Sequence, residues 1–490
     1  MIKKKYALIP VMPTPNGPLH LGHLAGPFLK MDILARHLRI LGHYVSIVSA
    51  TDPYESHILP VCKKESKDEL TVCKENYSNI NKCLENLSIK YDNFINPLDD
   101  EYREKLFEIT KKIIIQVLKD GNFSQKDEAI HFNSRTNDIV VASRIAGICP
   151  SCNANMGGYH CECCGQEVSP EELIEPYDTE NKDDVLKISR TSTLFIDSDY
   201  EYISKRMIDC NVPDEIKNIV SVYIKKHGPL VRISNPGDWG IKLKDIVRTD
   251  SEDVVFTYTN LISLAILCGE EIKKNLNIEY NPLSKDSDCI VVGSFGFDNT
   301  IPFCLSVDTL ANLSDEFRGF DYYLTNFFYT LDGKKFSTSR RHCIWGYDAL
   351  EILETNSDII RLYLSVTSPE LKKTNFSTDE FNEFRNKIQD FMISINEDKL
   401  YKPLNIDSVC NCSFFKESLR VIKKSLSLEN FSLQKSGKTI INWIENSEID
   451  QDVKVLGFAL LSTSIMPGIS DKIISNIEGF DDSLLNEIYS

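Results

Sequence analysis

Residues 6–23 read YALIPVMPTPNGPLHLGH, an apolar run that passes through a segment rich in proline and glycine to the start of a helix. The apolar part predicts a buried strand, and helical spacing begins at His20 and stops at Gly42. A second apolar run, YVSIVSA at 44–50, leads into Asp52. Strand, crossover helix and strand together predict an α/β fold with a doubly wound parallel sheet, which binds ligands at the carboxyl ends of its strands.

The α/β pattern is interrupted in the middle of the chain. Around residue 120 it gives way to short strand-like pieces and a cysteine cluster, and at about residue 253 it returns. A further buried strand, 289–293, leads to Gly296 and Asp298, and from about residue 378 only helical periodicity remains. We therefore expect a Rossmann-type domain in two halves, an insertion between them and a C-terminal α-helical bundle, with boundaries at 1–118, 119–240, 241–377 and 378–490.

The composition is typical of a multidomain enzyme. The chain has 490 residues, of which 42% are hydrophobic, and a formal charge of −17. The charge argues against non-specific binding to phosphate backbones and leaves a local basic groove as the way to bind nucleic acid. No run approaches the roughly 20 uncharged apolar residues that span a bilayer, and the amino end reads directly into a strand, so we expect a cytoplasmic protein without a membrane partner.

Two polar elements suit phosphate chemistry. His20 and His23 stand three residues apart at a helix entrance, where backbone N–H groups and the helix dipole favour an anion. The spacing by itself fits an ordinary loop–helix junction equally well. The second element, Lys335-Phe336-Ser337-Thr338-Ser339, reads either as an exposed charged turn or as cations and hydroxyls aimed at the charge that develops during phosphate chemistry.

Four cysteines predict a metal site. Cys149 and Cys152 form one C-x-x-C pair, and Cys161 and Cys164 form a second pair close behind it. This spacing predicts a closed tetrahedral zinc knuckle, which has a structural role because no coordination position stays open. The alternatives are four structural thiols without a metal, and a competing role for the fifth cysteine of the cluster, Cys163. The chain has 15 cysteines in all, an odd number and mostly scattered, which favours reduced thiols over disulfides.

These elements resemble a known family when they are taken in order. Residues 15–23, PNGPLHLGH, resemble the signature of class I aminoacyl-tRNA synthetases and of the methionyl enzyme in particular. Residues 331–340, LDGKKFSTSR, resemble the KMSKS loop of that family, with Thr338 in place of its second lysine. The segment from Cys149 to Gly165 and the SPEELI that begins at Ser169 resemble the inserted connective domain of the methionyl enzyme. The resemblance spans about residues 5–380.

The resemblance implies ATP-dependent activation of an amino acid to an aminoacyl-adenylate, with ATP, Mg²⁺ and structural Zn²⁺ as cofactors, methionine as the default amino acid and tRNA as the acceptor. It implies catalytic roles for His20, His23 and Lys335. It implies nucleotide contacts from Gly22, Gly296, Asp298, Lys335, Ser337 and Ser339, and amino-acid contacts from Met12, Thr14, Asp52 and Phe303.

Several positions depart from the family pattern. Thr14 replaces an aromatic residue, 254–257 replaces a segment that carries a tryptophan and an aspartate, and Phe303 falls near a histidine position. Altered walls can move selectivity to another amino acid. Two alternatives therefore stay open: a diverged paralogue that activates another amino acid for tRNA, a carrier protein or a small amine, and a non-catalytic binding protein. Trp443, in the acidic helical region, is either a core residue or a platform for a base, and the sequence does not set the oligomeric state.

Overall fold

A parallel sheet lies at the centre of the computed structural model, which describes residues 3–119, 123–159, 161, 163–336, 342–395, 406–475, 477 and 480–489. The strand order is β14-β13-β1-β2-β3 and all neighbours are parallel. The prediction of a doubly wound sheet is confirmed, and the order reverses at β1. The strands are β1 (Lys5–Pro10), β2 (Tyr44–Ala50), β3 (Asn93–Ile95), β13 (Ile290–Gly296) and β14 (Tyr322–Asn326).

Helices cover both faces of this sheet because successive strand residues point to opposite sides. Ala7 and Ile9 of β1 pack against α8, whereas Leu8 packs against α2. The predicted helix after β1 is broken: it starts as α1 and is kinked at Gly26, just before Pro27, and Gly42 with a φ of 75° follows its end. The helices around the sheet are α1 (Leu21–His23), α2 (Leu29–Ile40), α3 (Leu59–Glu65), α4 (Glu69–Asn86), α5 (Asp100–Lys119), α8 (Thr257–Leu276) and α9 (Asp308–Leu313).

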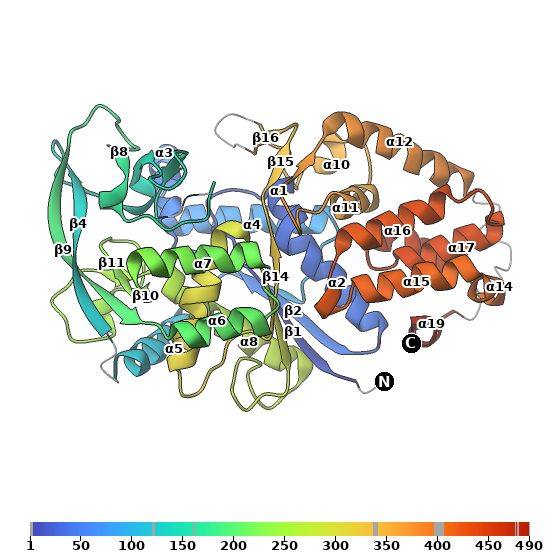
Figure 1. Cartoon of the computed structure of the whole chain (residues 1–490), viewed down its shortest axis with the longest axis horizontal. Helices are drawn as coiled ribbons and strands as arrows, with labels where there is room; N and C mark the ends of the chain where they lie inside the picture. Colours follow the sequence, from blue (N-terminus) through green and yellow to red (C-terminus); the bar gives the residue numbers. More distant parts are fainter. Residues whose placement is uncertain are drawn as a thin grey trace.

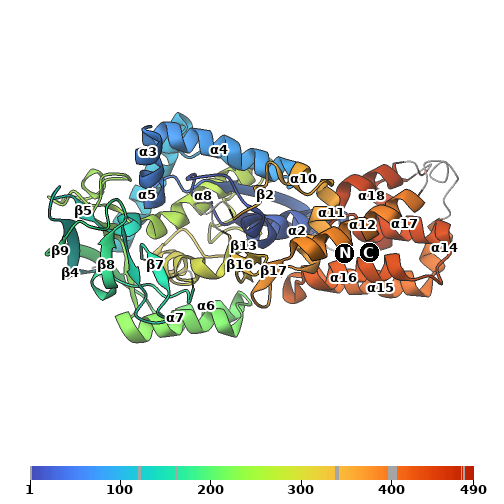
Figure 2. The same cartoon turned by 90° about the horizontal axis from the view of Figure 1, so that it is seen from above.

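The insertion stands at one end of the molecule and the helical bundle at the other (Figure 1). Seen from above, α4 and α7 lie on opposite sides of the molecule (Figure 2). A four-stranded sheet of order β10-β9-β4-β5 and a three-stranded sheet of order β7-β6-β8 build the insertion. Its elements are β4 (Phe123–Asn133), β5 (Ile139–Val140), β6 (Ile145–Ile148), β7 (Asn155–Gly157), β8 (Ile174–Asp178), β9 (Leu186–Asp197), α6 (Tyr200–Asp209), α7 (Asp214–His227) and β10 (Leu230–Arg232).

Short strands join the insertion to α8 and the central sheet to the bundle. β11 (Ser234–Asn235) pairs with β12 (Val254–Val255), and β15 (Tyr329–Leu331) pairs with β16 (Lys334–Lys335) and β17 (Thr374–Phe376). The helices that follow are α10 (Ala349–Ile352), α11 (Ser357–Val366), α12 (Thr378–Ser394), α14 (Ile406–Asn411), α15 (Ser413–Ser425), α16 (Leu433–Glu445), α17 (Gln451–Ser462), α18 (Pro467–Ile474) and α19 (Asp482–Tyr489). No helix within the described ranges is long and apolar enough to cross a bilayer.

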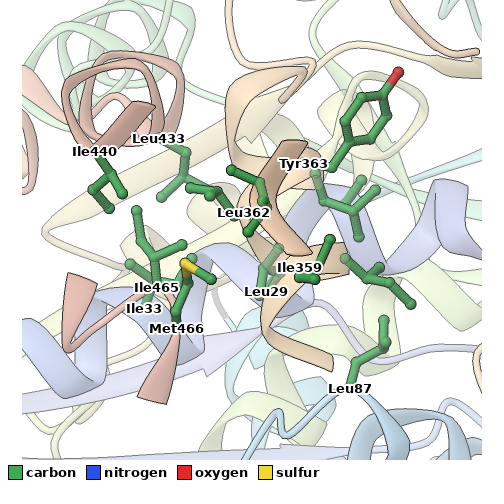
Figure 3. Close-up of a cluster of buried hydrophobic side chains, with 14 of the residues drawn as sticks. Leu29, Ile33, Leu87, Ile359, Leu362, Tyr363, Leu433, Ile440, Ile465 and Met466 are labelled. Carbon is green, nitrogen blue, oxygen red and sulfur yellow. The ribbon is translucent and has the colours of Figure 1, made fainter. Parts of the chain in front are cut away.

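The bundle shares one hydrophobic core with α2 and α4. Trp443 is fully buried in it and donates its indole N–H to the Lys454 carbonyl at 2.9 Å, so it is a core residue and not a platform for a base. Figure 3 shows the junction, where side chains from four places meet: Leu29 and Ile33 of α2, Ile359, Leu362 and Tyr363 of α11, Leu433 and Ile440 of α16, and Ile465 and Met466 between α17 and α18.

A buried ion pair crosses the same junction. Arg361 of α11 is fully buried and donates to Asp32 of α2 at 2.6 Å. The same guanidinium donates to the carbonyls of Leu87, Ser88, Ser464 and Ile465. Burial works against ionisation of Asp32, but the charges of Arg361 and Arg36 prevail and hold the pKa of this carboxyl below its ordinary value. One side chain thus joins a sheet-covering helix, the end of α4 and the bundle.

We expect Arg361→Met to destabilise the protein by about 3–5 kcal/mol, because it leaves the buried Asp32 carboxylate short of a partner. Urea unfolding followed by circular dichroism measures the change. The matched control is Arg420→Met, which breaks an exposed pair with Glu417 on α15 and should leave the unfolding midpoint unchanged. Equal midpoints for the two variants would show that the buried pair contributes nothing to the junction.

Candidate active site

A cavity of about 920 Å³ opens where the carboxyl ends of the central strands meet. Met12 and Thr14 follow β1, Asp52 follows β2, and Asp298 follows β13, and all four line the cavity. The start of α8 and residues of the insertion close the other sides. The cavity therefore lies at the reversal of strand order, the place where doubly wound sheets bind ligands.

Asp52 is the buried carboxylate of the cavity. Its backbone N–H donates to the Pro13 carbonyl at 2.9 Å, and its Oδ2 accepts from the Thr257 hydroxyl at 2.8 Å. Its Oδ1 is buried and has no hydrogen-bond partner among the described residues. Burial, followed by the nearby negative charge of Glu55, raises the pKa of Asp52 to about 7. A carboxylate oxygen in this state suits an ammonium group of a ligand.

Phe303 is the one predicted amino-acid contact that does not reach the cavity. Its side chain is 1% exposed and stacks on Phe295 of β13, with ring centroids 4.9 Å apart. It therefore packs in the core between the sheet and α9. Met12 and Thr14, by contrast, line the cavity beside Asp52.

His20 and His23 form a closed pair at the start of α1. The His20 N–H donates to His23 Nδ1 at 3.3 Å, the His23 N–H donates to His20 Nδ1 at 3.2 Å, and the rings stack 3.7 Å apart. Both Nδ1 atoms accept, so each neutral ring carries its proton on Nε2. Desolvation by the surrounding protein lowers the pKa of His20 to about 2. The pKa of His23 falls to about 4, although this residue is exposed. The pair offers two N–H donors, not two charges.

Phe336 covers this pair. Its ring stacks on His20 with centroids 4.5 Å apart, and it is buried. A Cβ on Gly22 would come within 2.8 Å of the Phe336 ring and within 3.0 Å of the His20 ring. Gly22 is therefore needed for this close approach, and the group that lies against it in the structure is a side chain of the chain itself.

Lys335 precedes Phe336 and lies at the end of β16, paired in register with Thr330. Its positive charge contributes to the low pKa values of both histidines, which places the ammonium within electrostatic reach of the pair. Burial in turn lowers the pKa of Lys335. Ser337 and Ser339, predicted as nucleotide contacts, and Thr338 lie outside the described residues.

Gly296 and Asp298 end the strand next to β1. Gly296 is the last residue of β13 and pairs in register with Asn326. Asp298 follows it and faces the cavity, and burial raises the pKa of its carboxyl. Gly296 and the triad of His20, His23 and Lys335 do not line the cavity. The candidate site thus has two parts, a cavity around Asp52 and the polar cluster of His20, His23 and Lys335.

The four predicted cysteines come together. The sulfurs of Cys149, Cys152, Cys161 and Cys164 all lie within 4.8 Å of one another, and Cys163 is exposed and outside this group. Each C-x-x-C turn ends on a residue in the left-handed region, Asn153 with a φ of 58° and Gly165 with a φ of 72°. Four thiolates at this spacing fit a tetrahedral metal ion.

Several aromatic and acidic residues that line the cavity are not among the predicted site residues. Tyr54 and Glu55 follow Asp52 so closely that their position was a usable signal. Thr257, which holds Asp52, begins the helix after β12. Tyr159 and Trp239 come from the insertion and carry no local pattern that points to the cavity.

Comparisons with known proteins agree with this geometry. The profile of the family described as tRNA synthetases class I (M) matches residues 9–392. A methionine–tRNA ligase of Pyrococcus furiosus is 28% identical over 421 residues, and one of Methanococcus aeolicus is 26% identical over 389 residues. The alignments cover 82% and 78% of this chain, and 56% of each relative, so the chain spans little more than half the length of these relatives.

Solved structures share the fold. The methionyl-tRNA synthetase of Mycobacterium tuberculosis in complex with methionyl-adenylate has a TM-score of 0.64 at 16% identity and covers 96% of this chain and 93% of its own. A LeuRS–tRNA–LeuAMS ternary complex from Agrobacterium radiobacter K84 has a TM-score of 0.68 at 11% identity, with coverage of 100% and 87%. Since the family profile covers most of the chain, the chain belongs to the class I tRNA synthetases of the M family.

Proposed function

We propose that the chain activates methionine with ATP to form methionyl-adenylate and passes the methionyl group to tRNA. The observation that carries the proposal is the buried Asp52 oxygen without a partner, at the floor of a cavity at the carboxyl ends of the strands. The related ligases are named for methionine, and the similar Mycobacterium tuberculosis structure contains methionyl-adenylate.

In this proposal Asp52 binds the α-ammonium group of the amino acid. The Thr257 hydroxyl donates to Oδ2, which leaves Oδ1 to accept a hydrogen bond from the ammonium. An ammonium in a nearly dry cavity forms a strong charge-assisted hydrogen bond with a carboxylate. Met12 and Thr14 then contact the substrate next to this anchor.

The polar cluster of His20, His23 and Lys335 binds the triphosphate. A carboxylate oxygen of the amino acid attacks the α-phosphorus of ATP, and the bond to the bridging oxygen breaks so that pyrophosphate leaves. The Nε2–H groups of His20 and His23 and the Lys335 ammonium stabilise the charge that grows on the phosphates. Gly22, Gly296, Ser337 and Ser339 contact the nucleotide, and Asp298 lies by the ribose. Mg²⁺, when bound, would neutralise part of the phosphate charge. Thr338 removes one ammonium from this set, a loss that can cost about 10²-fold in rate.

The architecture supports a division into four parts, 1–118, 119–240, 241–377 and 378–490. Strands β1–β3 and β13–β14 form one sheet although the insertion separates them in sequence.

We assign Zn²⁺ to the four-cysteine cluster, where it would supply a structural cross-link between the two turns. The 15 cysteines are all free in the structure, in keeping with a cytoplasmic location.

ATP–pyrophosphate exchange with each of the twenty amino acids tests the activity. We expect methionine to give the highest kcat/KM, and we expect Lys335→Met to reduce it about 10²-fold or more because a positive charge near the phosphates is lost. Lys334→Met is the matched control, since neighbouring strand residues point to opposite faces. Another amino acid as the best substrate would favour the diverged paralogue, and no exchange with any of them would favour a non-catalytic protein.

The pH profile tests the role of Asp52. Because burial and the charge of Glu55 raise its pKa to about 7, the carboxyl changes its protonation state near neutral pH. We expect kcat/KM for the amino acid to rise about tenfold per pH unit below pH 7 and to level off above it, because the ammonium binds the ionised form. Asp52→Asn should give a low and flat profile. A flat profile in the unchanged protein, with ATP saturating, would refute this role.

Metal analysis tests the zinc assignment. We expect the purified chain to hold about one zinc ion, and Cys149→Ser to lose it and to unfold at a lower temperature, because three thiolates bind zinc less well than four. Cys163→Ser, which changes a thiol of the same segment outside the cluster, should keep the metal. Loss of zinc from Cys163→Ser alone would mean that the ligand set is wrong.

A further inference from the structure

We propose that the part of the cavity beyond Asp52, lined by Tyr54, Glu55, Tyr159, Trp239 and Tyr258, binds a small organic amine in its cationic form. We call this part the amine pocket. Its ligand binds in addition to the α-ammonium group that Asp52 holds, so the inference deepens the proposed function and rests on it. The chemistry that recognises the ligand is a combination of carboxylates and aromatic faces.

The charge around the cavity is strongly negative. Besides Asp52, the carboxylates of Glu55, Glu69, Asp138, Glu180 and Asp238 line it. Among the described lining residues the one fixed positive charge is Arg144, and its guanidinium is already bound by Asp138, Asp178 and Glu180 at 3.0–3.2 Å. The excess of carboxylates favours a cationic ligand and repels phosphate groups.

Glu55 is the acidic residue that faces the amine pocket. Its Oε1 accepts from the neighbouring Ser56 hydroxyl at 3.0 Å, and no ion pair joins it to a described residue. Its negative charge acts on Asp52, Tyr159 and Tyr258, because it contributes to the raised pKa of each of these groups. The carboxylate therefore lies within electrostatic reach of the amino-acid anchor and of two tyrosines of the aromatic wall.

Aromatic rings form the rest of the wall. Tyr54 and Trp239 meet edge to face with centroids 5.6 Å apart, and the Trp239 indole is fixed by its N–H, which donates to the Pro53 carbonyl at 2.6 Å. Phe256 lies edge to face with Tyr159 at 5.6 Å and with Tyr258 at 4.6 Å. Ring faces next to carboxylates recognise organic ammonium groups by cation–π attraction and ion pairing together.

The unpartnered oxygen that the proposed function assigns to the α-ammonium group shows that this cavity is built to take a ligand. Asp52 is 5% exposed, lines the cavity, and its Oδ1 is buried without a hydrogen-bond partner among the described residues. A bound ammonium satisfies this oxygen, and a cavity of about 920 Å³ has room for much more than one amino acid, since drug-sized ligands fill cavities of this volume. His20, His23 and Lys335, which are proposed to hold the triphosphate, do not line the cavity, whereas Asp298, which is proposed to lie by the ribose, does.

Two sources can supply the second cationic group: a separate amine that stands beside the activated amino acid, or a cationic side chain of the amino acid itself. Both present an ammonium to Glu55 and the rings. They differ in whether methionine and the amine occupy the cavity at the same time, which is a measurable difference.

Calorimetric titration of the full chain with 1,4-diaminobutane tests the proposal. We expect saturable binding that weakens with added salt, and affinity about tenfold lower in Glu55→Gln, since one charge-assisted hydrogen bond is lost. Tyr54→Leu should weaken binding as well. Glu108→Gln, which removes the same charge from the exposed side of α5, is the control and should bind as the unchanged protein does. Equal affinity for Glu55→Gln and Glu108→Gln, or no saturable binding, would overturn the amine pocket.

Two further arms complete the experiment. Binding of the diamine that persists with saturating methionine identifies a separate amine, whereas competition with methionine together with pyrophosphate exchange on lysine or ornithine identifies a cationic side chain. Methionine-dependent exchange on the same preparation keeps the two hypotheses apart. Exchange without diamine binding refutes the amine pocket alone, and diamine binding without any exchange refutes the activation chemistry alone. Unfolding midpoints of the variants check that each one is folded.

Discussion

The buried pair of Arg361 and Asp32 is the interaction on which the arrangement of the molecule depends. Asp32 lies on α2, the helix that directly follows the histidine pair, and Arg361 lies on α11, at the entry to the bundle. Its other hydrogen bonds reach the end of α4 and the turn before α18. A buried guanidinium is costly unless all of its donors are used, so this geometry ties the bundle and the sheet in one relative position.

Low solvent access sets the electrostatics of both parts of the site. Desolvation lowers the pKa values of His20 and His23, so both rings are neutral N–H donors, and it raises the pKa of the buried Asp52. The two parts favour opposite charges. Lys335 belongs to the polar cluster, whereas carboxylates surround the cavity. This difference in charge would orient a substrate that has an anionic end and a cationic end.

The insertion contributes to the site as well as to the fold. Tyr159 and Trp239 line the cavity, and Gly165 of the cysteine cluster lies so close to Phe297, just after β13, that an added Cβ would come within 2.8 Å of that ring. The four-cysteine turns therefore rest against the strand end that carries Asp298. Loss of their cross-link is expected to disturb the cavity wall as well as the insertion.

Local patterns along the chain are enough to predict the strand–helix–strand unit, the two cysteine pairs, and the positions of His20 and Asp52 after strands. Only the tertiary structure decided that Phe336 lies on Gly22, that Phe303 turns into the core, and that Thr257 holds Asp52 from 205 residues away. The physical reason is that periodicity and turn chemistry are local, whereas the partner of a buried group is set by how distant elements pack.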